Sequence, residues 1–229
     1  MPQKTFKKID GTTFIRFGPG EEAQTIDFNP GDFILTHGNT KISRLIQFGQ
    51  CIRFRGADKK YAWWNHAALI VSEEGDLIEA LGAGVRETNI SKYKPTEYYL
   101  VQIGSLATEH DREKVIKFAK SCIGIPYGKL IIMSIALSLF TGCKFTFGFD
   151  GQSICSGLVA RALERTSIIF NRTPSHITPA DLAKYFSVEP PEPGTDKGEI
   201  PRLPHREKGV TLIKMREGGD LDGDIGAED

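Results

Sequence analysis

The chain has 229 residues, and 40% of them are hydrophobic, which is enough to bury the core of one domain and too much for general disorder. Its 29 basic and 29 acidic residues balance, so no overall positive charge indicates a nucleic-acid partner. The N-terminal segment has positive charges but no apolar run behind them, and no apolar segment reaches membrane-spanning length. We therefore expect a cytoplasmic location, or one within a virion or similar assembly.

The first elements in chain order are short strands. Residues 1–29 are expected to form an N-terminal extension, in which Thr12 to Phe17 adds to a sheet or covers its edge. A strand that opens with a Gly-Asp pair follows, from Gly31 to Gly38. The next segment holds a short basic cluster, interpreted as a solvated loop rather than a binding patch: Arg53, Arg55, Lys59 and Lys60.

A β-hairpin is predicted in the middle of the first half of the chain. Two apolar runs, Ala67 to Val71 and Leu77 to Leu81, flank turn residues around Gly75. Counting by two from the turn places His66, just before the first run, on the same face as Glu79 in the second. A histidine and a carboxylate therefore share one face of adjacent strands.

Such a pair suits a catalytic base and the group that orients it. The Glu79 carboxylate would hold the His66 imidazole and stabilise its protonated form. A tight two-residue turn would put Glu79 opposite Ile70, so direct contact with His66 needs twist, a bulge or another register. The alternatives are a structural histidine in a strand and a charge at a sheet edge.

An apolar segment runs from Leu130 to Phe140, interrupted only by two serines. It is about half as long as the roughly 20 residues that a membrane-spanning helix needs. A buried helix or a hydrophobic lip over an active site is the first interpretation. The second is that this segment receives an acyl chain or contacts a membrane surface.

A second reactive residue follows in the segment GFDGQSICSGLVARALERT. Asp150 and Ser153 are good helix N-cap types, and apolar residues recur behind them at helical spacing, so a helix should begin just before Cys155. The first turn of a helix favours the thiolate, which is the nucleophilic form of cysteine. Ser156 adds little bulk beside the thiol and is a candidate substrate-binding residue. The alternative is that Cys155 is a small buried hydrophobic residue.

The other three cysteines have ordinary surroundings. Cys51 precedes the basic cluster, Cys122 ends an amphipathic helix, and Cys143 follows a Thr-Gly turn. None has a metal-ligand partner at two-residue spacing, and the four cysteines show no evident pairing pattern. We expect a reducing compartment and neither a metal nor an organic cofactor.

The end of the chain changes in character. The segment TPADLAKYF, Thr178 to Phe186, predicts a last helix. Residues 188–229 are rich in proline, glycine and acidic residues and poor in aromatic ones. They predict an extended tail, which can dock on a protein partner.

Three separated segments resemble the NlpC-type papain-like cysteine peptidases. These are IGIPYG at Ile123 to Gly128, GFD at Gly148 to Asp150, and CSGLV at Cys155 to Val159. The histidine hairpin precedes the cysteine helix, an order similar to that of the circularly permuted branch, the YiiX-like proteins and their lecithin:retinol acyltransferase relatives. One departure is an insertion, Gln152 to Ile154, between the GFD segment and the cysteine.

The resemblance implies an α+β papain-like fold over residues 30–187, with an antiparallel sheet packed against the nucleophile helix. It implies that Cys155 is the nucleophile, His66 the base and Glu79 the orienting residue. It also implies that Tyr127, in the GIPYG segment, offers its hydroxyl to the substrate. The alternative for Tyr127 is a buried ring with a satisfied hydroxyl.

The resemblance leaves three functions open. The wider family implies a cysteine hydrolase that cleaves cell-wall peptides through a thioacyl enzyme. The permuted branch allows a lipid or acyl-group substrate, handled by hydrolysis or acyl transfer. The third is a structural module without catalysis, within a larger phage or secretion assembly.

Overall fold

The computed structural model describes residues 5–9, 11–125 and 155–191. The predictions for Tyr127, for Leu130 to Phe140, for the helix caps at Asp150 and Ser153 and for most of the tail lie outside the described residues. The described residues include the whole predicted hairpin and a helix that is described from Cys155 onward.

One sheet organises the fold. Its seven strands lie in the order β1-β2-β7-β3-β4-β5-β6, and every neighbouring pair is antiparallel. The strands are β1 (Thr5–Ile9), β2 (Thr12–Phe17), β3 (Phe33–Thr36), β4 (His66–Ile70), β5 (Asp76–Leu81), β6 (Gly84–Asn89) and β7 (Tyr98–Gln102). The predicted strand Thr12 to Phe17 is confirmed, and it lies inside the sheet between β1 and β7.

Four α-helices and five short 3-10 helices complete the described elements. They are α1 (Lys41–Arg53), α2 (Glu109–Ser121), α4 (Cys155–Leu163), α5 (Pro179–Tyr185), η1 (Thr25–Asp27), η2 (Gly56–Trp63), η3 (Ile90–Tyr93), η4 (Gly104–Leu106) and η5 (Pro174–His176). Threonine side chains cap α1, α2 and α5 by accepting hydrogen bonds from backbone N–H groups in the first turn. The predicted α+β class and the late helix are confirmed.

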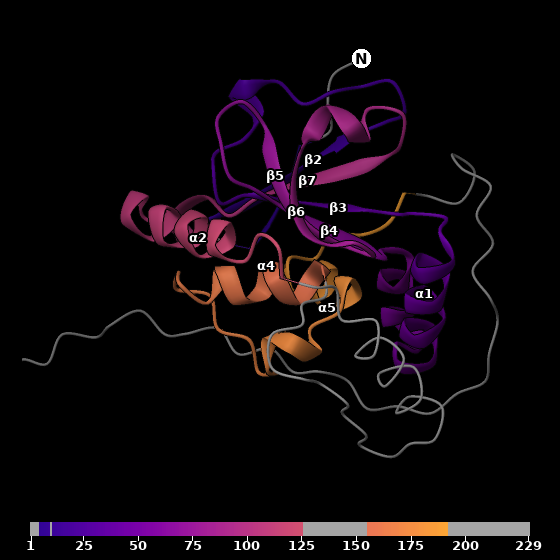
Figure 1. Cartoon of the computed structure of the whole chain (residues 1–229). Coiled ribbons are helices and arrows are strands. Elements are labelled where there is room, and N and C mark those ends of the chain that lie inside the picture. The colour runs from indigo at the N-terminus through magenta and orange to yellow at the C-terminus, as the bar shows by residue number, and fades with distance from the viewer. Residues whose placement is uncertain (1–4, 10, 126–154, 192–229) are drawn as a thin grey trace, which may run out of the picture.

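The sheet separates two apolar clusters, because strand side chains alternate between its faces. On one face Phe33, Leu35, Ala67 and Leu69 pack with α2, α4 and α5. Figure 1 shows α4 and α5 below the sheet, with α2 to the left of the strands. On the other face Ile34, Ala68, Ile70 and Leu77 form a smaller cluster with Ile90 and Tyr93 of η3. Helix α4 and the residues around η3 therefore lie against opposite faces.

The hairpin is confirmed, and its register differs from the one that a tight two-residue turn would give. Ile70 pairs with Leu77, and the Val71 N–H donates to the Asp76 carbonyl, so four residues, 72–75, form the turn. Gly75 has φ +84°, and a Cβ there would lie 2.7 Å from Cγ2 of Ile90. A glycine suits both the backbone and the close approach of η3.

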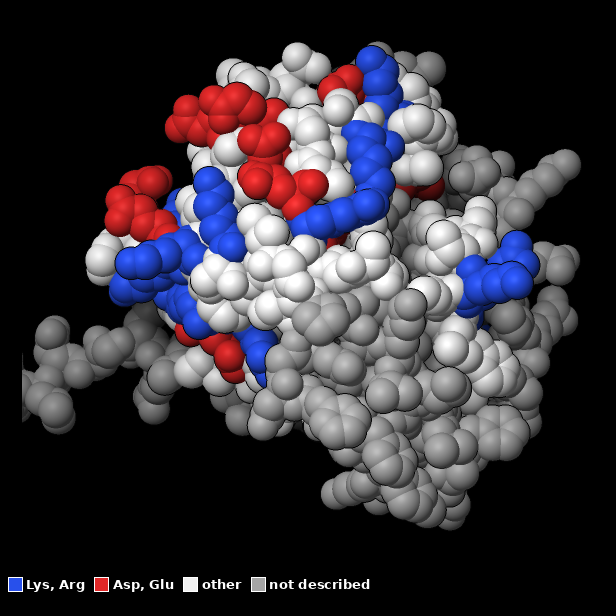
Figure 2. Space-filling model, in the orientation of Figure 1, with Lys and Arg blue, Asp and Glu red and all other residues white. Residues whose placement is uncertain are grey.

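The basic cluster does not form the predicted solvated loop. Arg53 ends α1 and forms an ion pair with the buried Asp181 of α5, while Lys59 and Lys60 lie on η2. Lys60 pairs with Glu189. On the face seen in Figure 2, acidic and basic side chains lie next to one another, with several acidic groups together at one end. Among the described helices, none combines the length and apolarity needed to cross a bilayer.

Candidate active site

Cys155 is the first described residue of α4, and its side chain is buried. The thiol receives hydrogen bonds from His66 and from the backbone N–H groups of Ala67 and Ser156. Burial alone would raise the pKa of Cys155, but the charge and hydrogen bond of His66, followed by the two backbone groups, lower it below its ordinary 9.0. The arrangement favours a thiolate.

His66 is the first residue of β4 and lies between two acidic partners. Its Nε2–H donates to Oε2 of Glu79 at 2.9 Å, which leaves Nδ1 as the ring nitrogen for Cys155. Burial alone would lower the pKa of His66. The negative Cys155 thiolate, the hydrogen bonds and the Glu79 carboxylate outweigh burial and raise the pKa from 6.5 to about 9. The three residues form a connected chain with alternating charge.

The strand register explains how Glu79 reaches His66. Continuing the Ile70–Leu77 and Leu69–Ile78 pairs puts Glu79 opposite Ala68, so His66 is its diagonal neighbour on the same face. A long side chain spans that diagonal. The described β4–β5 pairs stop at Leu69, so the hairpin opens toward His66. At this open end the Ala67 amide lies within hydrogen-bonding reach of the Cys155 sulfur.

Glu79 is fully buried, and each of its two carboxylate oxygens accepts two hydrogen bonds. Oε2 accepts from His66 and from the Tyr93 hydroxyl at 2.5 Å, while Oε1 accepts from Lys92 Nζ at 2.5 Å and from the Thr88 hydroxyl at 2.8 Å. Burial alone would raise the pKa of Glu79, but His66 first, then Lys92 and Tyr93, hold it well below its ordinary range. The Glu79 carboxylate therefore stays ionised.

The short helix η3 supplies two of these donors, and the hairpin turn holds it in place. The Ile90 N–H donates to the Gly75 carbonyl at 2.9 Å. The Asn89 side chain donates to the Glu74 carbonyl and to Asp76, and it accepts from the Ser91 N–H. Because η3 is fixed to the turn that begins β5, its side chains keep a defined position beside Glu79.

Sequence reasoning missed Thr88, Lys92 and Tyr93. Thr88 could have been predicted once β5 and β6 were paired. Glu79 pairs with Arg86, and Thr88 lies two residues further along β6 on the same face. Lys92 and Tyr93 carried no comparable signal. Their place depends on the docking of η3 on the turn, which no local pattern announces.

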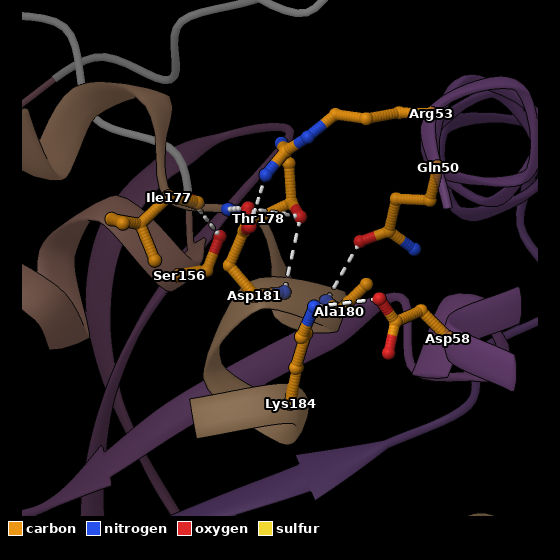
Figure 3. A network of polar contacts seen from close by, with 9 residues as sticks. All are labelled: Gln50, Arg53, Asp58, Ser156, Ile177, Thr178, Ala180, Asp181 and Lys184. Atoms are coloured by element: carbon orange, nitrogen blue, oxygen red, sulfur yellow. Dashed lines mark hydrogen bonds and ion pairs between the residues drawn. The ribbon is translucent and has the colours of Figure 1, made fainter. Parts of the chain in front are cut away.

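Ser156 is brought next to the thiol, but its side chain has another partner. Its buried hydroxyl donates to the Ile177 carbonyl at 2.7 Å, just before the Thr178 cap of α5 (Figure 3). Asp181 completes that cap and pairs with Arg53, and Gln50 accepts from the Ala180 N–H (Figure 3). The hydroxyl thus ties the start of α4 to α5, while its role in substrate binding stays a prediction.

The other described cysteines provide an internal comparison. Cys51 and Cys122 are each 5% exposed and Cys155 is 1% exposed, so the three side chains differ little in their exposure to solvent. Burial raises the pKa of both Cys51 and Cys122. Cys155 alone among the described cysteines has a lowered pKa, which results from its partners and not from exposure.

In the described part of the chain, no group of three or more His, Cys, Asp or Glu residues is arranged to hold a metal ion. Comparison with protein-family models and with curated protein sequences found no match to this chain. The geometry of the Cys155, His66 and Glu79 site is therefore the main guide to function.

Proposed function

We propose that this protein is a papain-like cysteine hydrolase with a permuted order of catalytic residues, acting through a thioacyl-enzyme intermediate. The observation that carries the proposal is the hydrogen-bonded chain from Cys155 through His66 to Glu79. It combines a nucleophile at a helix start, a base at a strand start and a buried carboxylate.

The reaction begins from a thiolate and an imidazolium. The Cys155 sulfur attacks the carbonyl carbon of the substrate, forming a C–S bond and moving the carbonyl π electrons to oxygen. The backbone N–H of Cys155, at the first residue of α4, is a candidate donor to that oxyanion. When the intermediate collapses, His66 gives its proton to the leaving nitrogen or oxygen, and a thioester remains.

Hydrolysis of the thioester uses the same groups. His66 takes a proton from a water molecule whose oxygen attacks the thioester carbon, and the C–S bond then breaks to release a carboxylic acid. The thiolate and the imidazolium are thereby restored. Throughout, Glu79 accepts from Nε2–H and keeps the other ring nitrogen directed at sulfur. Transfer to an alcohol or amine in place of water would need no further side chain.

The proposed substrate is an amide bond in a cell-wall peptide, and this part of the proposal comes from the resemblance to NlpC-type peptidases. A lipid or other acyl group is the competing substrate, from the resemblance to the permuted branch. Incubation with purified peptidoglycan, and separately with phospholipid vesicles, separates the two by mass spectrometry. New peptide fragments support the first, whereas altered lipids support the second. Cys155→Ser serves as the inactive control in both.

Whether the site is reactive can be tested without knowing the substrate. We expect iodoacetamide at pH 6 to label Cys155 at least ~10-fold faster than any other cysteine, since alkylation requires the thiolate. His66→Ala should abolish this preference. Peptide mapping by mass spectrometry after timed quenching measures both rates. Equal, slow labelling of all four cysteines in the wild-type protein would contradict the proposed function and favour a structural module.

A further inference from the structure

We propose that Lys92 is a positioning residue of the active site, which shares the Glu79 carboxylate with His66 and limits how strongly that carboxylate holds the imidazolium. This inference rests on the proposed function and deepens it. It assigns the active site a fourth member, contributed by η3, which neither the motifs nor the resemblance indicates.

The contact geometry separates the two cations. Lys92 Nζ donates to Oε1 of Glu79 at 2.5 Å, and His66 donates to the other oxygen, Oε2, at 2.9 Å. Lys92 therefore competes for the charge of the carboxylate without occupying the place of the imidazole. Its ammonium group also lies 5.2 Å from the ring centroid of Tyr93, whose hydroxyl donates to Oε2. A cation near that ring adds a second attraction that holds Lys92 in this position.

The charges along the site alternate in sign when Lys92 is included. A thiolate, an imidazolium, a carboxylate and an ammonium follow one another, so their formal charges sum to zero. Without the ammonium, the buried group would be negative overall. The other groups that face Glu79 are Thr88 and Tyr93, which are neutral, and Arg86 of β6, which pairs with Glu79 in register and is exposed. Lys92 is the compensating cation in direct contact.

The exposure of Lys92 distinguishes this role from a structural one. Its side chain is 40% exposed, whereas that of Glu79 is 0% exposed. Because the ammonium group keeps part of its contact with water, this ion pair should add less to folding stability than a fully buried pair would. Its field at a buried carboxylate nevertheless acts on the adjacent imidazolium. A change at Lys92 should therefore alter proton affinities more than it alters the fold.

The direction of that change is set by the charges. Removing a positive charge makes loss of a proton harder for both partners of the thiolate–imidazolium pair. The unshared carboxylate also holds the His66 proton more firmly. Both steps in a plot of Cys155 reactivity against pH should therefore move to higher pH, by about half a pH unit after screening by solvent and salt.

The experiment compares Lys92→Met and Lys92→Arg in the full chain. Iodoacetamide labelling of Cys155 is measured from pH 4 to 10, with Lys94→Met as the matched control. Lys94 lies two residues away on the chain and pairs with Glu22, so its loss removes the same charge without touching Glu79. We expect the upward shift in Lys92→Met and in a second neutral variant, Lys92→Gln. Lys92→Arg and Lys94→Met should keep the wild-type profile.

The outcomes separate the two proposals. If the wild-type protein shows no reactive thiolate below pH 8, the proposed function fails. If it shows one, but Lys92→Met and Lys92→Gln both give the wild-type profile, the proposed function stands and the role of Lys92 is overturned. A shift of equal size in Lys94→Met would also overturn it, because the effect would then reflect net charge alone.

Discussion

Two buried carboxylates, Asp32 and Glu79, show how differently the same group can be used. Both are 0% exposed and both contact a cation. Asp32 accepts from the Asn29 and Ile103 N–H groups and from Arg112, yet burial dominates and its pKa is raised above 3.8. Glu79 has its pKa held low, because two cations and two hydroxyls surround it.

The cations explain the contrast. Arg112 divides its donors between Asp32 and the carbonyls of Pro30 and Gly104, so it ties α2 to the segment before β3 and to η4, and it gives the carboxylate only part of its charge. The partners of Glu79 can each respond: His66 can release its proton, and Lys92 reaches water. One carboxylate joins structural elements, and the other stabilises the charged form of a histidine.

The sharpest way to break the comparison is the same substitution at both positions. Asp32→Asn should lower the free energy of unfolding by about 3 kcal/mol, because it leaves the charge of Arg112 buried without an anion. Cys155 in the folded variant should keep its wild-type alkylation rate. Urea unfolding followed by tryptophan fluorescence, together with labelling at pH 6, measures both. A stable variant with a slow Cys155 would reverse the roles of the two carboxylates.

Glu79→Gln should show the opposite pattern. Loss of the negative charge favours release of a proton from His66, so the step of the Cys155 pH profile that belongs to the imidazolium should move to lower pH by about one unit, opposite to the shift expected for Lys92→Met. The loss of folding stability should be smaller than for Asp32→Asn, since His66 can become neutral and Lys92 can be hydrated. Urea unfolding and the labelling of Cys155 from pH 4 to 10 measure the two effects. A wild-type pH profile in this variant would mean that Glu79 does not act on His66.

A smaller effect tests whether the turn positions η3. Gly75→Ala should cost about 1–2 kcal/mol, from its positive φ and from the contact with Ile90, and should shift Lys92 and Tyr93 away from Glu79. Gly20→Ala is the matched control, because Gly20 has φ +92° but no atom within 4 Å of a Cβ placed there. Both should lose stability, whereas the pH profile of Cys155 should change only in Gly75→Ala.

Local sequence patterns predicted much of this architecture. Alternation predicted that His66 and Glu79 share a face, and helical spacing predicted a helix at Cys155, because both depend on periodicities of two and 3.6 residues. The register of the hairpin depends on the number of residues in its turn, and the position of Gly75 alone does not give that number. The hydrogen bonds from Lys92 and Tyr93 to Glu79 depend on the docking of η3, and the ion pair of Arg53 depends on the packing of α5. Both are tertiary contacts, which no local pattern predicts.

The Ala67 amide, at the open end of the hairpin, offers a way to detect an acyl group bound to Cys155. At Ala67 the sulfur of Cys155 takes the place that a strand carbonyl would have beside this amide. The N–H proton of Ala67, which can exchange with solvent, therefore links the sheet to the Cys155 sulfur. Acylation converts the thiolate into a thioester, a much weaker acceptor, so the Ala67 amide should exchange faster whenever an acyl group is bound. Hydrogen exchange at one residue would then report occupancy of the site without a labelled substrate.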